Sequence, residues 1–108
     1  MDKFVEHKIK NNKPTFILLS YQDNKILIEF YKINLLTKTY KLISELHIPS
    51  LKEKQLIENV LIKYEYNIKQ INDLWIIAVY QSENINIYSL KIYNDPLKRH
   101  KYFCKLNI

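Results

Sequence analysis

The chain of 108 residues contains no glycine. Glycine reaches positive φ angles without steric cost, so two-residue hairpin turns and helix ends favour it. Its absence excludes the phosphate-binding loop, the dinucleotide-binding fingerprint and the nucleophile elbow of hydrolases, which all need glycine. Asparagine tolerates the left-handed region best among the remaining residues, so we expect it at the turns. The candidates are Asn11, Asn12, Asp23, Asn24, Asn34, Asn67, Asn84, Asn94 and Asp95.

Cysteine and long apolar runs are also scarce. Cys104 is the only cysteine, so the sequence offers no intrachain disulfide and no cysteine-based metal site, which favours a reducing compartment. No apolar run approaches the ~20 residues of a membrane-spanning helix. The opening residues MDKFVE are too charged for a signal peptide. We therefore expect a cytoplasmic protein that does not enter a membrane.

The composition is that of a folded, basic protein. Hydrophobic residues make up 47% of the chain and aromatic residues 13%, which excludes general disorder. The length suits a single domain over residues 1–108. The formal net charge of +6 favours a polyanionic partner such as RNA.

Hydrophobic periodicity predicts most of the secondary structure. A short helix is expected over residues 3–10, with Phe4, Val5 and Ile9 sharing one face. Residues 66–73 are expected to form a polar connection, and 97–108 a basic aromatic tail. Alternating or continuously apolar segments predict strands at residues 15–21, 25–33, 39–48, 74–81 and 85–93. Within 39–48, strict alternation places Tyr40, Leu42, Ser44, Leu46 and Ile48 on one face.

A capping box predicts the main helix. Ser50 and Glu53 have the required spacing, and apolar residues follow at positions 56, 57, 60, 61 and 64. This pattern predicts a helix over 51–65 whose Leu56, Val60 and Leu61 pack against Trp75, Ile77 and the sheet. The expected fold class is α+β, an antiparallel sheet of about five strands with one main helix packed on one face.

One strand pair occurs twice at a constant offset. Tyr21, Ile26, Ile28 and Lys32 in the first copy match Tyr80, Ile85, Ile87 and Lys91 in the second. Both copies resemble the middle strands of β-propeller blades. This resemblance implies a partial propeller that would have to complete its ring within a larger assembly.

The sequence shows no catalytic or metal-binding signature. His7, His47 and His100 lie far apart, and no pair of them has metal-ligand spacing. Cys104 and His100 would share one face of a strand, but no orienting group accompanies them. We expect a protein that is not an enzyme, has no cofactor, and binds neither a metal nor a small-molecule substrate.

Three groups of basic residues are candidate RNA contacts. Lysines bind phosphates, and interleaved aromatic residues stack on unpaired bases. The predicted contacts are Lys8, Lys10 and Lys13 near the N-terminus, Lys52, Lys54 and Lys63 on the main helix, and Lys98, Arg99, Lys101, Tyr102 and Lys105 in the tail.

The order of elements resembles the family of eukaryotic large-subunit ribosomal protein twenty-two. The family's first helix is similar to the segment that contains Phe4, Lys8, Ile9 and Lys10. Its final hairpin is similar to the segment that contains Trp75, Val79, Tyr88 and Tyr93. The family's glycine-rich segment and acidic tail have no counterpart here. The resemblance implies a structural protein of the large ribosomal subunit that contacts ribosomal RNA and neighbouring ribosomal proteins, with RNA bound through Lys52, Lys54 and Lys63. A protein–protein interaction module within another assembly is the alternative, with strand 85–93 or 97–108 pairing with a partner.

Overall fold

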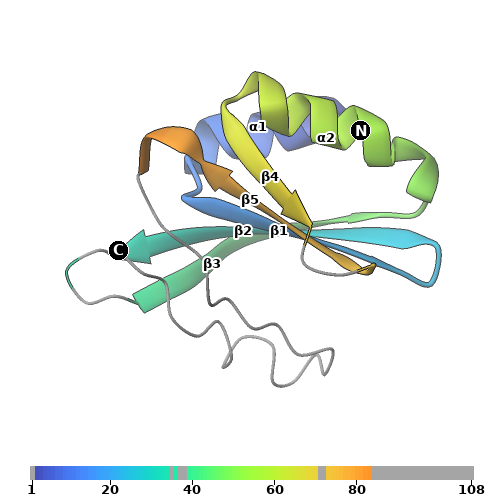
Figure 1. Ribbon diagram of the computed structural model, residues 1–108, viewed down its shortest axis with the longest axis horizontal. Helices are drawn as coiled ribbons and strands as arrows, with labels where there is room; N and C mark the ends of the chain where they lie inside the picture. The colour runs from blue at the N-terminus through green and yellow to red at the C-terminus, as the bar shows by residue number, and fades with distance from the viewer. Residues whose placement is uncertain (1, 35, 37–38, 71–72, 84–108) are drawn as a thin grey trace.

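A computed structural model of the chain describes residues 2–34, 36, 39–70 and 73–83. Two helices and five strands make up this part, with a short 3₁₀ turn before the second helix and another after the last strand (Figure 1). Their order is α1 (Asp2–Asn12), β1 (Phe16–Gln22), β2 (Lys25–Asn34), β3 (Thr39–Ile48), η1 (Leu51–Glu53), α2 (Lys54–Lys63), β4 (Tyr66–Gln70), β5 (Trp75–Tyr80) and η2 (Gln81–Glu83).

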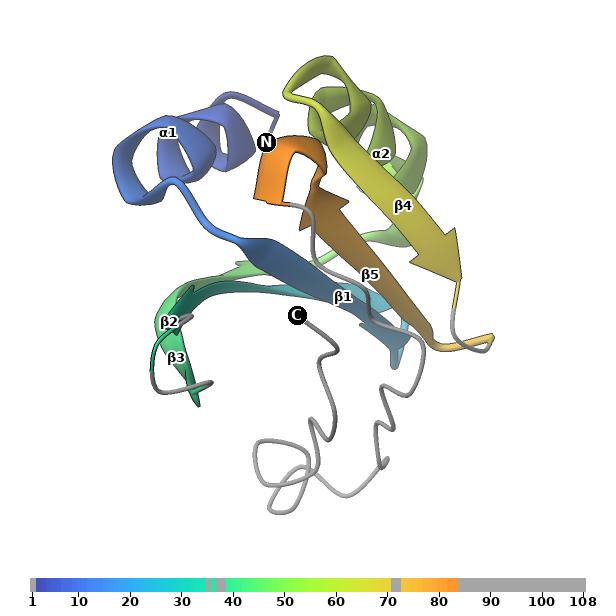
Figure 2. The ribbon, with the colours of Figure 1, turned by 60° about the vertical axis from the view of Figure 1, so that its left-hand side comes forward.

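The five strands form one antiparallel sheet in the order β3-β2-β1-β5-β4. Both helices lie on the same face of this sheet, and β2 and β3 curl away from them (Figure 2). Helix α2 carries the chain from β3 at one edge to β4 at the other. The predicted α+β class, with about five antiparallel strands and a main helix on one face, is confirmed.

Strand β4 corrects the prediction of a polar connection over residues 66–73. It pairs with β5 from Tyr66 opposite Tyr80 to Gln70 opposite Ile76. Tyr66 and Ile68 alternate with polar residues, but Gln70 ends the pattern after these two apolar positions, which is too short a run to predict a strand. The predicted strand 85–93, which holds the rest of the second copy of the repeat after Tyr80, and the tail 97–108 lie outside the described residues.

The sheet separates two clusters of buried side chains. On the helix face, Ile17, Leu19 and Tyr21 of β1 pack with the helices and with β2, β3, β4 and β5. On the opposite face, which we call the far face, Phe16 and Leu18 belong to a second cluster. That cluster contains Phe16, Leu18, Tyr31, Trp75 and Ile77, with Ile33, Tyr40 and Val79 packed against it.

Helix α2 packs on the face that Trp75 and Ile77 do not occupy, so the predicted contact with those residues is wrong. Successive strand residues point to opposite faces, and β5 directs Ile76 and Ala78 toward the helices instead. Leu56 was also expected to be buried, but it is 51% exposed. Val60, Leu61 and Ile57 form the buried stripe, and Leu56 is rotated from Ile57 by about 100° around the helix.

Two further face assignments differ from the periodicity. Phe4 of α1 is 61% exposed, while Val5 and Ile9 are buried, so the apolar face of α1 is narrower than predicted. In β3, the pairing with β2 skips Ile43 between Leu42 and Ser44. Such a bulge reverses the alternation along a strand. Tyr40 therefore joins the far-face cluster, whereas Leu46 packs on the helix face.

Four residues with positive φ replace glycine in the described chain. Asp23 and Asn24, at 53° and 58°, form the two-residue turn between β1 and β2, as the sequence predicts. The other two, Lys13 at 45° and Glu65 at 67°, follow the ends of α1 and α2. Asparagine was expected at such positions, yet a lysine follows α1 and a glutamate follows α2.

The buried stripe of α2 predicts a contrast between its two central leucines. Leu61 is fully buried, so Leu61→Ala should lower the free energy of unfolding by ~2–5 kcal/mol. Leu56→Ala on the same helix should change it by less than ~0.5 kcal/mol, because the side chain is half exposed. Urea denaturation followed by circular dichroism measures both. Equal losses for the two variants would contradict this packing.

The conformation of Glu65 predicts a stabilising substitution. A residue other than glycine costs ~1–2 kcal/mol in the left-handed region, so Glu65→Gly should raise the free energy of unfolding by up to ~1 kcal/mol. Glu58→Gly, inside α2, should lower it by ~1 kcal/mol. A loss of stability in both variants, measured by urea denaturation, would show that Glu65 is not strained.

Candidate nucleic-acid interface

The structure describes six of the predicted RNA-contacting residues. Lys8 and Lys10 lie on α1, and Lys13 follows the end of that helix. Lys52 lies in η1, while Lys54 and Lys63 are the first and last residues of α2. All are exposed except Lys8, which is half-buried. The other five predicted contacts, Lys98, Arg99, Lys101, Tyr102 and Lys105, lie outside the described residues.

A groove lies where the C-terminal ends of both helices meet the ends of β4 and β5. Its volume is about 470 Å³, within the range of ligand sites in proteins. Because α1 ends beside β1 and α2 ends beside β4, the groove gathers residues that are far apart in sequence. We call it the tyrosine groove, and it is lined by Ile9, Lys10, Lys13, Pro14, Tyr64, Tyr66 and Tyr80.

Tyr66 is the buried tyrosine of the groove and connects two of its segments. Its side chain is 5% exposed, and its hydroxyl donates a hydrogen bond to the carbonyl of Pro14. This bond joins the start of β4 to the segment that links α1 to β1. The Tyr66 and Tyr80 rings lie 5.3 Å apart at a tilt of 41°. Tyr80 and Tyr64 are only half-buried, so both present part of their surface to solvent.

Two lysines approach the ring of Tyr64. The Nζ atoms of Lys10 and Lys63 lie 5.8 Å and 5.5 Å from its centroid, within the range of cation–π contacts. Lys63 also pairs with Glu6 of α1 at 3.2 Å, which ties the two helices together. Within the described part of the chain, no carboxylate pairs with Lys10 or Lys13. These two lysines therefore provide the uncompensated charge of the groove.

The remaining helix lysines do not join this group. Lys52 and Lys54 lie at the opposite end of α2, about 15 Å away by the rise of the helix. The Nζ atom of Lys54 lies 4.9 Å from the ring centroid of Tyr21. The six described candidates thus separate into Lys10, Lys13 and Lys63 at or beside the groove, and Lys52 and Lys54 at the start of α2. Lys8 of α1 does not line the groove.

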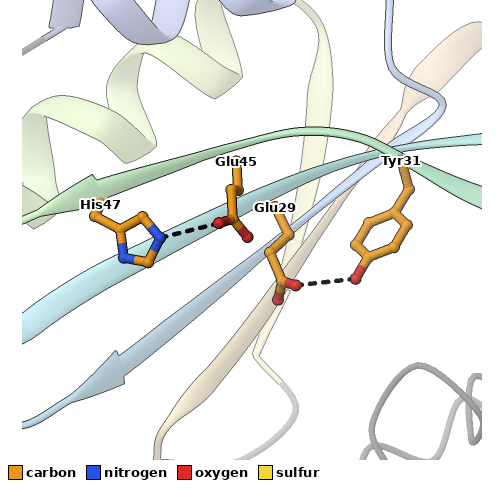
Figure 3. A network of polar contacts seen from close by, with 4 residues as sticks. All are labelled: Glu29, Tyr31, Glu45 and His47. Atoms are coloured by element: carbon orange, nitrogen blue, oxygen red, sulfur yellow. Dashed lines mark hydrogen bonds and ion pairs between the residues drawn. The ribbon is translucent and has the colours of Figure 1, made fainter. Parts of the chain in front are cut away.

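A polar cluster on the far face has no counterpart in the predicted sites (Figure 3). Glu29 is fully buried, and its Oε2 accepts a hydrogen bond of 3.1 Å from the Tyr31 hydroxyl. Glu45 lies opposite Glu29 on the neighbouring strand and contacts His47 at 3.2 Å. The only sequence signal was a glutamate among apolar residues in β2. The carboxylates of both glutamates can accept hydrogen bonds. Only Glu29 is buried, however, while Glu45 and His47 are exposed.

The described residues contain no group of three or more His, Cys, Asp or Glu side chains that could hold a metal ion. His7 bonds to Asn11 on the surface of α1, and His47 bonds to Glu45. His100 and Cys104 lie outside the described residues. Each of the two described histidines thus bonds to a side chain of its own element, His7 within α1 and His47 within β3.

Comparison of the chain with family models, curated proteins and solved structures gave no match. Neither described helix is long and apolar enough to cross a membrane.

The hydrogen bonding of two buried tyrosine hydroxyls, Tyr66 in the groove and Tyr21 in β1, predicts opposite effects of their removal. Tyr66→Phe removes the bond to Pro14 and should lower the free energy of unfolding by ~1 kcal/mol. The Tyr21 hydroxyl is buried and has no hydrogen-bond partner among the described residues. Tyr21→Phe should therefore raise stability by ~1 kcal/mol. Urea denaturation at neutral pH measures both, and equal effects would contradict this assignment.

Tyr21 also predicts a dependence on alkaline pH. Burial, assisted by the Glu58 carboxylate, raises the pKa of Tyr21 well above its ordinary value of 10.0. Above pH 10 the unfolded chain releases this proton while the folded chain retains it, so stability falls as pH rises. The wild type should lose more stability than Tyr21→Phe between pH 9 and 11, in the same denaturation assay. Parallel losses would contradict the raised pKa.

Proposed function

We propose that this chain is a non-enzymatic RNA-binding protein that serves a structural role in the large ribosomal subunit. The carrying observation is the tyrosine groove, where two lysines that form no ion pair within the described part of the chain adjoin three tyrosines. Phosphates and unpaired bases are the two parts of RNA that such side chains recognise. The resemblance to ribosomal protein twenty-two supports the ribosomal part of the proposal, and the lack of a catalytic signature in the sequence supports the non-enzymatic part.

The distribution of charge supports a second contact through the tail. Residues 84–108 carry five of the 17 basic residues, and Asp95 is their only acidic residue. Most of the net charge of +6 therefore belongs to this last quarter of the chain. A basic segment of this kind attracts phosphates over a distance of about one Debye length. Lys98, Arg99, Lys101 and Lys105 would add phosphate contacts to those at the groove.

Edge-strand pairing with another protein is the second candidate function. Strand β3 forms one edge of the described sheet, is ten residues long, and presents Leu42 with 36% exposure. Such an edge can pair with a strand of a partner. A partial propeller has less support, because β1 and β5 are antiparallel neighbours within one sheet, whereas propeller blades are separate sheets.

Salt dependence separates these two functions. Replacing Lys98, Arg99 and Lys101 together by alanine should weaken RNA binding and reduce the slope of log K against log salt by about two to three units. Tyr102→Ala should weaken binding by ~1–3 kcal/mol if its ring stacks on a base. Fluorescence anisotropy with a labelled ribosomal RNA fragment at several salt concentrations measures both effects.

The matched control removes the same charge from the sheet. Lys25, Lys32 and Lys41 are exposed strand residues outside the groove, and their triple alanine variant should reduce the slope by less than one unit. Equal losses in the two triple variants would indicate general charge attraction. RNA binding that is absent, or independent of salt, in the wild type would favour the protein–protein module.

A further inference from the structure

We propose that the tyrosine groove takes one unpaired RNA base against Tyr64 and Tyr80, with the adjoining phosphates on Lys10 and Lys13. This inference rests on the proposed RNA-binding function and specifies the ligand of the groove. A nucleotide presents a flat ring on one side and an anionic phosphate on the other. The groove offers aromatic surface from its tyrosines and, at the end of α1, the ammonium groups of Lys10 and Lys13, which pair with no carboxylate among the described residues.

The aromatic lining divides into a buried floor and accessible walls. Tyr66 is the floor, because it is 5% exposed and its hydroxyl is already bonded to the Pro14 carbonyl. Tyr64 and Tyr80 are the walls, since both are half-buried and present part of their surface to solvent. Aromatic faces stack on any base, and each stacked base contributes ~1–3 kcal/mol. The walls therefore favour stacking without strong preference for one base.

The cations are placed to bind phosphate once a base is present. Lys10 is exposed, and its Nζ lies 5.8 Å from the Tyr64 centroid. A base that stacks on Tyr64 would displace this ammonium toward solvent, where the flexible lysine stem can reach a phosphate. Lys13 lines the same groove from the backbone position with φ of 45°. Lys63 contributes less, since Glu6 already neutralises it.

This mode of binding requires single-stranded RNA, so duplex RNA should not bind in the groove. Bases within a duplex are stacked on their neighbours, and only unpaired bases can be inserted between aromatic side chains. An acidic peptide would use the two lysines but would gain no stacking from Tyr64 and Tyr80. The aromatic lining thus favours a single-stranded nucleotide over a carboxylate-bearing segment.

The first experiment compares RNA forms with the wild-type chain. A labelled single-stranded RNA of 12 nucleotides should bind at least tenfold more tightly than a duplex of the same length, measured by fluorescence anisotropy at constant salt. A polyglutamate peptide should fail to compete at equal charge concentration. Equal affinity for both RNA forms, or full competition by the peptide, would overturn the inference while leaving an electrostatic RNA contact possible elsewhere on the chain.

The second experiment tests the walls and cations separately. Replacing Tyr64 and Tyr80 together by leucine should weaken single-strand binding about five- to 150-fold without altering the salt slope. The double phenylalanine variant keeps both rings and should retain wild-type affinity. Lys10→Gln with Lys13→Gln should reduce the slope by about 1.4, for two single-strand phosphate contacts. Lys25→Gln with Lys41→Gln, the charge-matched control, should leave it within 0.5.

The outcomes distinguish this inference from the proposed function. Wild-type binding that is salt dependent but unchanged in the Lys10 and Lys13 variant would place the RNA outside the groove and overturn the inference alone. A loss of affinity in the phenylalanine variant equal to that in the leucine variant would also overturn it. An absence of RNA binding in the wild type would overturn both. Circular dichroism and thermal denaturation establish that each variant is folded, and the exposed lysine variants remain informative if the leucine variant is not.

Discussion

The burial of β1 on both faces is the constraint on which the rest of the described structure depends. It is the central strand, pairs with β2 and β5, and six of its seven residues are buried. Its odd positions face the helices and its even positions face the far side. The two helices can therefore stabilise only half of its apolar surface, and the far-face cluster must be stabilised separately. A polar substitution in β1 would therefore bury a polar group without a hydrogen-bond partner in one of the two clusters.

The position of the tyrosine groove follows from how the chain enters and leaves the sheet. Helix α1 reverses at Lys13 to enter β1, and α2 reverses at Glu65 to enter β4. Both residues adopt positive φ in a chain without glycine, so both reversals carry backbone strain. The Tyr66 hydroxyl then joins them by its bond to Pro14. The strained reversals thus bring together the C-terminal ends of two helices that lie far apart in the sequence. The groove forms where these ends meet.

The sequence predicts the local structure better than the arrangement in space. Period-2 and helical patterns, together with Ser50, identify both helices and four of the five described strands. The sequence does not predict strand β4, because backbone pairing with β5 at the sheet edge, rather than a run of buried side chains, defines this strand. The bulge at Ile43 and the orientation of β5 depend on partners that no local pattern contains. Lys10, Lys13 and Lys63 were predicted as RNA contacts from charge alone. The position of Lys10 and Lys13 in one groove with three tyrosines, and of Lys63 beside Tyr64, requires the tertiary fold, as does the buried carboxylate of Glu29.

Photochemical crosslinking of the wild-type chain would identify the residues that contact RNA, because it needs no substitution and maps the site of contact. A single-stranded RNA that contains 4-thiouridine would be crosslinked, digested with nuclease and protease, and mapped by mass spectrometry. The account predicts crosslinks on peptides that contain Tyr64 or Tyr80, and their loss when unlabelled single-stranded RNA competes. Crosslinks confined to peptides of the sheet edge β3 or of η1, with none at the groove, would contradict it.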